Sequence, residues 1–128
     1  MGRRGYVMTR QPEYGSCISD WAQTSFYEFL TRKKLEVSAP GTDCVNVEDA
    51  DHWEIGIPER QKGRGKKRKW FVDYGAILKI AAQMRRRPGC VRDNCEKSAY
   101  GEYCAKLLEE GVAAAKRQKL ATITIDWW

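Results

Sequence analysis

Apolar side chains recur every three or four residues in three segments of the chain, which predicts three amphipathic helices. We expect these helices to cover residues 19–35, 73–87 and 93–119. Asp73 is placed to cap the second helix, and Pro88 with the glycine after it ends that helix. In the third helix, the expected inward positions are Tyr100, Tyr103, Cys104, Leu107, Leu108 and Val112.

Apolar and polar residues alternate in two further segments, and this period of two predicts β-strands. One segment is 53–57, and the other is the C-terminal stretch 121–128 (ATITIDWW). Residues 69–72 (KWFV) are rich in aromatic and β-branched side chains, which also favours a strand. A short strand at 44–47 is a further candidate. The C-terminal strand is expected beside it or beside the hairpin that the other two strands form.

The strands at 53–57 and 69–72 are expected to pair as an antiparallel hairpin, with residues 58–68 as its long tip. Two strands alone are only marginally stable, so the apolar face of this hairpin must pack on the helices. We expect Trp53 and Trp70 to anchor it there. The predicted fold class is therefore α+β, with three helices packed on a small antiparallel sheet that includes a β-hairpin with a long basic tip.

The chain has 128 residues, which suffices for one domain with one hydrophobic core. Residues 1–16 are expected to form a flexible N-terminal lead-in, and residues 17–128 a single α+β domain. Apolar residues make up 42% of the chain, which argues against a disordered basic tail. Trp128 has no evident inward position, and the two terminal tryptophans leave a homodimer open.

Positive charge is concentrated in one stretch of the chain. Seven of the ten residues at 60–69 (RQKGRGKKRK) are Lys or Arg, and the net charge of +6 comes from this stretch. A local cluster of cations attracts phosphates, because each neutralised phosphate releases condensed counterions. Gly63 and Gly65 would let a phosphate approach closely. The alternative is a solvated loop or a nuclear-import signal. The candidate phosphate contacts are Arg60, Lys62, Arg64, Lys66, Lys67, Arg68 and Lys69.

A second group of cations, Arg85, Arg86 and Arg87, closes the second predicted helix. Cations at this position complement the helix dipole, and this structural role alone could explain them. They could equally flank the hairpin tip and widen its footprint. We therefore include these three arginines among the candidate nucleic-acid contacts.

The sequence holds five cysteines, of which Cys90, Cys95 and Cys104 lie close together. Structural zinc sites present closely spaced ligand pairs, which this arrangement lacks. A zinc site completed by Cys44 or His52 is the alternative. We expect no metal and no cofactor, and we expect Cys104 to be a small buried hydrophobic residue on its helix.

The chain offers little for catalysis. Its single histidine, His52, lies next to Asp49, Asp51 and Glu54, so a metal-assisted nuclease can be written down. A solvated acidic turn before a strand explains the same residues. Consecutive side chains on a strand point in opposite directions, which argues against a shared metal site. The sequence has neither a Gly-x-Ser-x-Gly elbow nor a Walker-type phosphate loop. We therefore expect a binding protein that has no catalytic residues and is not an enzyme.

No apolar run approaches the ~20 residues that a membrane span requires. The N-terminal residues also lack the apolar stretch of a secretory signal. We expect no membrane association and a location in the reducing cytoplasm of the host cell, or in the nucleus if that host is eukaryotic.

Two segments carry a resemblance to a known family. Residues 26–30 read FYEFL in the first predicted helix, and residues 67–89 read KRKWFVDYGAILKIAAQMRRRPG, a strand that runs into a helix ending in a basic turn. From Phe26 to Cys104 this order of features resembles the N-terminal DNA-associated domains of phage antirepressors, of the AntA and KilA-N type. The resemblance implies an association with DNA. The long cationic tip and the C-terminal ATITIDWW depart from the family pattern, and no residue role is carried over.

The sequence thus favours a small nucleic-acid-binding protein, a viral or mobile-element regulator that contacts phosphates through its basic hairpin loop. DNA is favoured over RNA as the partner. The alternative is a virus-encoded, protein-binding effector that inhibits a host nucleoprotein or defence complex. In that case the cationic tip mimics or displaces nucleic acid, and the tryptophans supply the residues that contribute most to binding.

Overall fold

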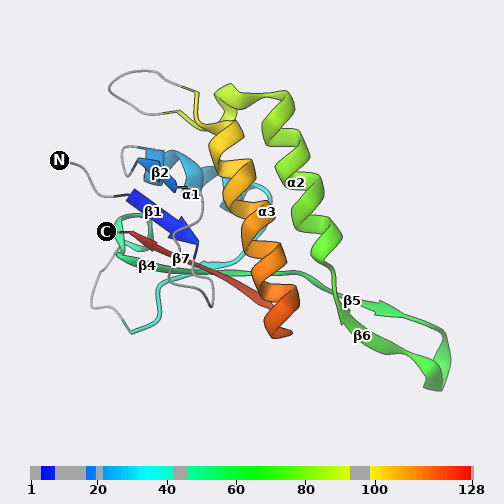
Figure 1. Cartoon of the computed structure of the whole chain (residues 1–128). Helices are drawn as coiled ribbons and strands as arrows, with labels where there is room; N and C mark the ends of the chain where they lie inside the picture. The colour runs from blue at the N-terminus through cyan, green and yellow to red at the C-terminus, as the bar shows by residue number, and fades with distance from the viewer. Residues whose placement is uncertain (1–3, 8–16, 20–21, 42–45, 93–98, 128) are drawn as a thin grey trace.

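A computed structural model of the chain describes residues 4–7, 17–19, 22–41, 46–92 and 99–127. Its α-helices are α1 (Gln23–Arg32), α2 (Tyr74–Arg86) and α3 (Gly101–Gln118). Its strands are β1 (Arg4–Val7), β2 (Cys17–Ser19), β3 (Val37–Ser38), β4 (His52–Gly56), β5 (Glu59–Lys62), β6 (Lys69–Val72) and β7 (Thr122–Trp127). Short 3-10 helices are η2 (Val47–Asp49), η3 (Gly65–Lys67) and η4 (Pro88–Cys90). The predicted α+β class is confirmed (Figure 1).

The main sheet is antiparallel and has the strand order β2-β1-β7-β4-β3. The C-terminal strand β7 lies at its centre, between β1 and β4. On β7 the side chains of Ile123, Ile125 and Trp127 are buried, while the residues between them are partly exposed. The alternation in the C-terminal sequence therefore predicted a strand correctly, with one face in the core and the other turned outward.

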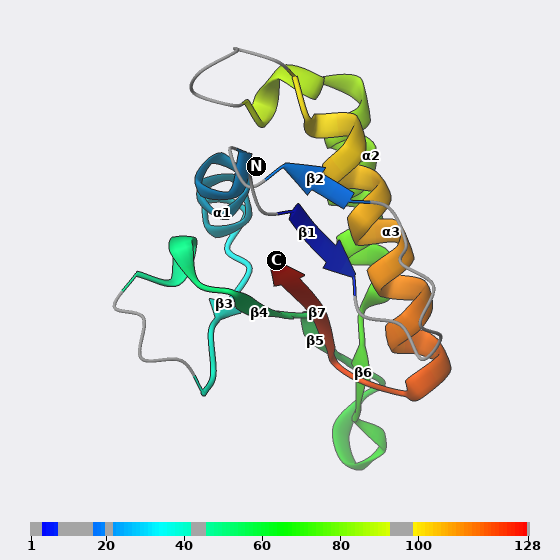
Figure 2. The same ribbon diagram turned by 60° about the vertical axis from the view of Figure 1, so that its left-hand side comes forward.

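The helices cover the apolar face of this sheet (Figure 2). The centroids of the Phe26 ring on α1 and the Trp53 ring on β4 are 5.9 Å apart. On α3, a Cβ at Gly111 would lie only 2.4 Å from the Ile123 side chain, so the glycine lets the helix approach β7 closely. Because Trp53 and Ile123 point to the same face, α1 and α3 share that face, and α2 packs against α3. The opposite face of β4 and β7 faces away from the helices.

Trp53 is the centre of the core. It is fully buried, and its ring meets the edge of the Trp127 ring with centroids 4.9 Å apart. Its indole Nε1–H donates a hydrogen bond to the carbonyl oxygen of Val47, over 2.7 Å. The buried amide of Gln23 donates to the carbonyl of Ala50, over 2.8 Å, so the segment before β4 is tied to α1. The buried polar groups of Trp53 and Gln23 thus have hydrogen-bond partners, whereas the indole Nε1–H of Trp127 is buried without one among the described residues.

The predicted helices are confirmed, with different limits. The carboxylate of Asp73 accepts a hydrogen bond from the amide of Ala76, over 3.2 Å, and caps α2 as expected. The first helix begins later than predicted, at Gln23, and the third begins at Gly101, while residues 93–98 lie outside the described residues. Tyr103 was expected to point inward, but 57% of it is exposed, because α3 packs through the face that carries Cys104 and Leu107.

A hairpin with a basic tip exists, but the predicted pairing of its strands is wrong. The partner of β6 is β5, whereas β4 pairs with β7 and β3 in the main sheet. The expected anchor Trp70 is 65% exposed. Pro58, which has no N–H to donate to a ladder, separates β4 from β5, and the chain leaves the sheet there. The hairpin points away from the helices, so within it only Val72, at the base, packs against the core.

The expectation of a flexible lead-in is wrong for Arg4–Val7, which forms β1 in the interior of the sheet. A Cβ at Gly5 would lie 2.6 Å from the ring of Trp127, so the absence of a side chain at Gly5 makes room for that ring. The rest of residues 1–16 lies outside the described residues. The same holds for residues 44–45 of the predicted strand 44–47, whose last residue, Val47, lies in η2 and not in a strand. Of the two terminal tryptophans that left a homodimer open, Trp127 is buried in the core and Trp128 lies outside the described residues.

Candidate nucleic-acid interface

The β5–β6 hairpin projects from the body of the protein beside the N-terminus of α2 (Figure 1). Its two strands are antiparallel, and every residue from Glu59 to Phe71 is exposed. Arg60 forms an ion pair with the N-cap residue Asp73, which ties the base of the hairpin to α2. The hairpin is therefore a two-stranded ribbon held at one end.

The ribbon has two chemically different faces. Cross-strand partners share a face, and so do residues two positions apart along a strand. The register therefore puts Arg60, Lys62, Lys69 and Phe71 on one face, which we call the cationic face. The other face carries Glu59, Gln61, Trp70 and Val72.

Lys62 and Lys69 lie directly opposite each other on the cationic face. Like charges in this position destabilise a strand pair, by a few tenths of a kcal/mol up to about 1 kcal/mol. Among the residues that the structure describes, no acidic side chain forms an ion pair with the remaining cations of the hairpin. These cations are Lys62, Arg64, Lys66, Lys67, Arg68 and Lys69. An external polyanion would remove the repulsion between them.

The tip turns on two glycines with positive φ angles, Gly63 at 105° and Gly65 at 58°. A Cβ at Gly63 would lie 2.5 Å from the carbonyl oxygen of Lys67, so a larger residue cannot fit there without moving the backbone. Residues Gly65–Lys67 then form the single turn η3. The glycines thus let the chain pack against itself, and the cations of the tip project from a compact turn.

The three arginines at the end of α2 do not flank this tip. The 13 residues of α2 place them roughly 20 Å from the base of the hairpin, at a rise of 1.5 Å per residue. Arg85 forms an ion pair with Glu109 on α3 and lies 3.7 Å from the carboxylate of Glu102, and the hydrogen bond to Glu109 raises the pKa of Arg85. Arg85 therefore joins α2 to α3, and Arg86 and Arg87 remain exposed.

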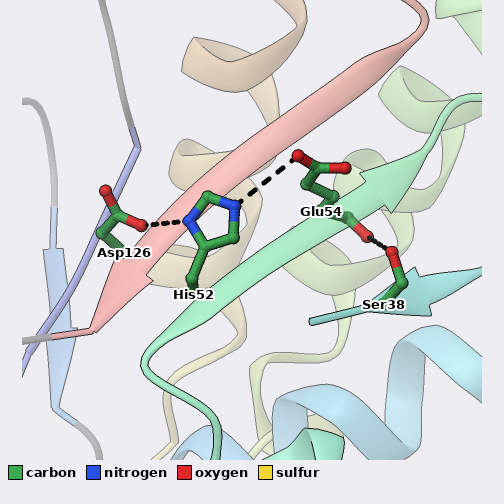
Figure 3. Close-up of polar contacts among 4 residues, drawn as sticks. All are labelled: Ser38, His52, Glu54 and Asp126. Carbon is green, nitrogen blue, oxygen red and sulfur yellow. Dashed lines mark hydrogen bonds and ion pairs between the residues drawn. The ribbon is translucent and has the colours of Figure 1, made fainter. Parts of the chain in front are cut away.

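His52 lies on the outward face of the sheet, between two carboxylates (Figure 3). Its Nδ1 is 2.5 Å from Oδ1 of Asp126 on β7, and its Nε2 is 3.6 Å from Oε1 of Glu54. The hydrogen bond with Asp126 is the main cause of a raised pKa of His52, and burial, the next largest effect, acts in the opposite direction. The sequence suggested Glu54 as a neighbour but not Asp126, 74 residues away, because strand register cannot be read from the pattern.

This pair predicts a pH dependence of stability. The pKa of His52 is raised above its ordinary value of 6.5 in the folded protein. The stabilisation that protonated His52 provides is therefore complete below the ordinary pKa, and it is lost as the pH rises through the raised pKa. The free energy of unfolding, measured in urea, should fall between about pH 5.5 and about pH 9 more in the wild type than in the His52→Gln variant. Asp126→Asn should flatten the dependence in the same way. Equal pH dependence in all three proteins would contradict the assignment.

The cysteines show no metal site within the described part of the chain, where no three His, Cys, Asp or Glu side chains are grouped to hold an ion. Cys104 is fully buried on α3, as predicted, and burial raises its pKa well above the ordinary value. Cys44 and Cys95 lie outside the described residues. Among the described residues, no helix is long and apolar enough to cross a membrane.

Comparisons of the chain with protein-family models, with curated proteins and with solved structures found no match. The candidate interface is therefore defined by its own geometry, as a projecting ribbon with a cationic face and a cationic tip.

Proposed function

We propose that the protein binds nucleic acid, and that the β5–β6 ribbon is the element that contacts the phosphates. One observation carries this proposal: six cations of the ribbon lack an acidic partner among the described residues, whereas Arg60 and Arg85 have one. Surface cations that serve solubility are usually interspersed with acidic residues. Here they are concentrated on one projecting element, where a phosphate backbone can reach them.

The shape of the ribbon favours duplex DNA over RNA. The major groove of B-DNA is about 12 Å wide and admits a two-stranded β-ribbon. The major groove of an RNA duplex is deep and narrow, and side chains cannot read it. With the cationic face turned to the groove, Lys62 and Lys69 can reach the phosphates along its walls, and Phe71 lies beside them on the same face. This arrangement supplies affinity for any sequence, because phosphate contacts carry no direct information about the bases.

A charge-matched comparison tests this function. Lys66→Ala with Lys67→Ala removes two cations from the tip, while Lys79→Ala with Lys106→Ala removes two exposed cations from α2 and α3. Both double variants have the same net charge. The tip variant should bind a random DNA duplex about tenfold more weakly or worse, measured by fluorescence anisotropy at about 0.1 M salt. The helix variant should change the affinity about twofold or less. Equal losses would show that net charge, and not the ribbon, determines binding.

A second function, binding to a protein partner, is favoured by Trp70. This residue is exposed on the face opposite the cationic face, and tryptophan is enriched in the centres of protein interfaces. When the cationic face is turned to DNA, Trp70 lies on the opposite face of the ribbon. Trp70→Ala should therefore change the DNA affinity by about twofold or less, which corresponds to ~0.4 kcal/mol. Failure of the wild type to bind duplex DNA or RNA at low salt, with Trp70 needed for capture of a protein, would favour the second function.

A further inference from the structure

A pocket of about 410 Å³ lies between the C-terminal ends of α1 and α2, at the far end of α2 from the ribbon. Ligand pockets for small molecules in proteins typically have volumes of roughly 300–1,000 Å³. The lining residues come from the last turns of the two helices and from η4, and they are Phe29, Lys33, Gln83, Arg86, Arg87 and Cys90. The pocket is therefore of small-molecule size and is formed where the ends of α1 and α2 meet η4.

The walls of the pocket are strongly positive. Lys33, Arg86 and Arg87 converge on it from two helices, and within the described residues none of them forms an ion pair with an acidic side chain. Arg85, one position before Arg86, does form ion pairs, with the carboxylates of Glu102 and Glu109. The C-terminal end of each helix carries about half a negative charge, so two helix ends offset only part of these three cations. An excess of positive charge remains at the mouth of the pocket.

The rest of the lining suits a ligand with both charged and neutral parts. Phe29 is largely buried, and the Nζ of Lys33 lies 5.5 Å from the centroid of its ring, which restrains the lysine at the pocket edge. The side-chain amide of Gln83 can both donate and accept hydrogen bonds. The guanidinium groups of Arg86 and Arg87 can each bind a phosphate through two parallel N–H groups.

We propose that this pocket binds a small phosphate-bearing molecule of about mononucleotide size, with its phosphate held by Lys33, Arg86 and Arg87. This site is separate from the ribbon, because α2 spans roughly 20 Å between them. It is also independent of the proposed binding of DNA.

Cys90 provides a readout specific to the pocket. It lines the pocket and is only partly buried, so a bound ligand should shield its thiol from iodoacetamide. Alkylation would be followed for each cysteine separately by mass spectrometry, in the full-length protein. Inorganic pyrophosphate and ATP, each at a concentration that fills at least ~80% of the sites, should slow the alkylation of Cys90 about fivefold or more. Adenosine, which has no phosphate, should have no effect, and the rate at Cys104 should not change.

Matched variants identify the groups that hold the ligand. Arg86→Gln with Arg87→Gln should raise the concentration of pyrophosphate needed for half-protection about tenfold or more, since a charge-assisted hydrogen bond is typically worth a factor of ten. Lys79→Gln, an exposed cation of α2 outside the pocket, should leave it unchanged. An alkylation rate of Cys90 that ignores both phosphate ligands would overturn the proposal. Protection that persists in the double-arginine variant, or that only a DNA duplex produces, would overturn it as well.

Discussion

Replacing Trp53 by alanine is expected to lower the free energy of unfolding by about 3–5 kcal/mol. The side chain is fully buried and packs against Phe26 and Trp127, so its removal leaves a cavity at the centre of the core. The deletion also leaves the carbonyl of Val47 without the hydrogen bond from the indole nitrogen. A typical small domain has a total stability of about 5–15 kcal/mol, so this loss would remove a large fraction of the stability.

Urea denaturation followed by far-ultraviolet circular dichroism measures this effect, and Trp70→Ala is its matched control. The control removes a side chain of the same type, but from a position that is 65% exposed, so it should change the free energy of unfolding by less than about 1 kcal/mol. Similar losses in the two variants would contradict the placement of Trp53 in the core and Trp70 on the ribbon.

The helices and the central strand could be predicted because their patterns are long and regular. The apolar stripe of α2, with its capping Asp73 and the proline after its end, defines that helix from the sequence alone. The alternation from Ile123 to Trp127 likewise defines β7. In both cases one continuous face is buried, so the sequence pattern directly reflects the packing.

The pairing of the strands could not be predicted. The strand β5 consists of Glu59, Arg60, Gln61 and Lys62, with no apolar residue, so no hydrophobic pattern marks it. It forms because the turn at Gly63 returns the chain beside it and not because it buries a face. The contact between His52 and Asp126 depends on the register of β4 against β7, and a shift of that register would separate the two side chains.

The composition of the chain located the candidate site but did not show which of its cations are already neutralised. All seven basic residues between Arg60 and Lys69 look alike in the sequence, and only the structure shows that Arg60 is paired with Asp73. The same holds for Arg85, which differs from Arg86 and Arg87 only by its position on the side of α2 that faces α3. The two groups of arginines and lysines also proved to lie at opposite ends of α2.

Replacing Lys66, Lys67, Arg68 and Lys69 together by alanine should have the largest effect on binding. These side chains are exposed and have no ion-pair partner in the described part of the chain, so the free energy of unfolding should change by less than about 1 kcal/mol. Binding to duplex DNA should weaken by at least about two orders of magnitude at 0.1 M salt, because each lost phosphate contact removes most of one released counterion.

The dependence of DNA affinity on salt concentration tests the central claim most directly. For the wild type, a plot of the logarithm of the association constant against the logarithm of the salt concentration should have a slope of about −5 if the six unpaired cations of the ribbon contact phosphates. In the four-residue variant the slope should become shallower by roughly 3–4 units. An unchanged slope in a correctly folded variant would contradict the claim that this ribbon is the part of the protein that binds phosphates.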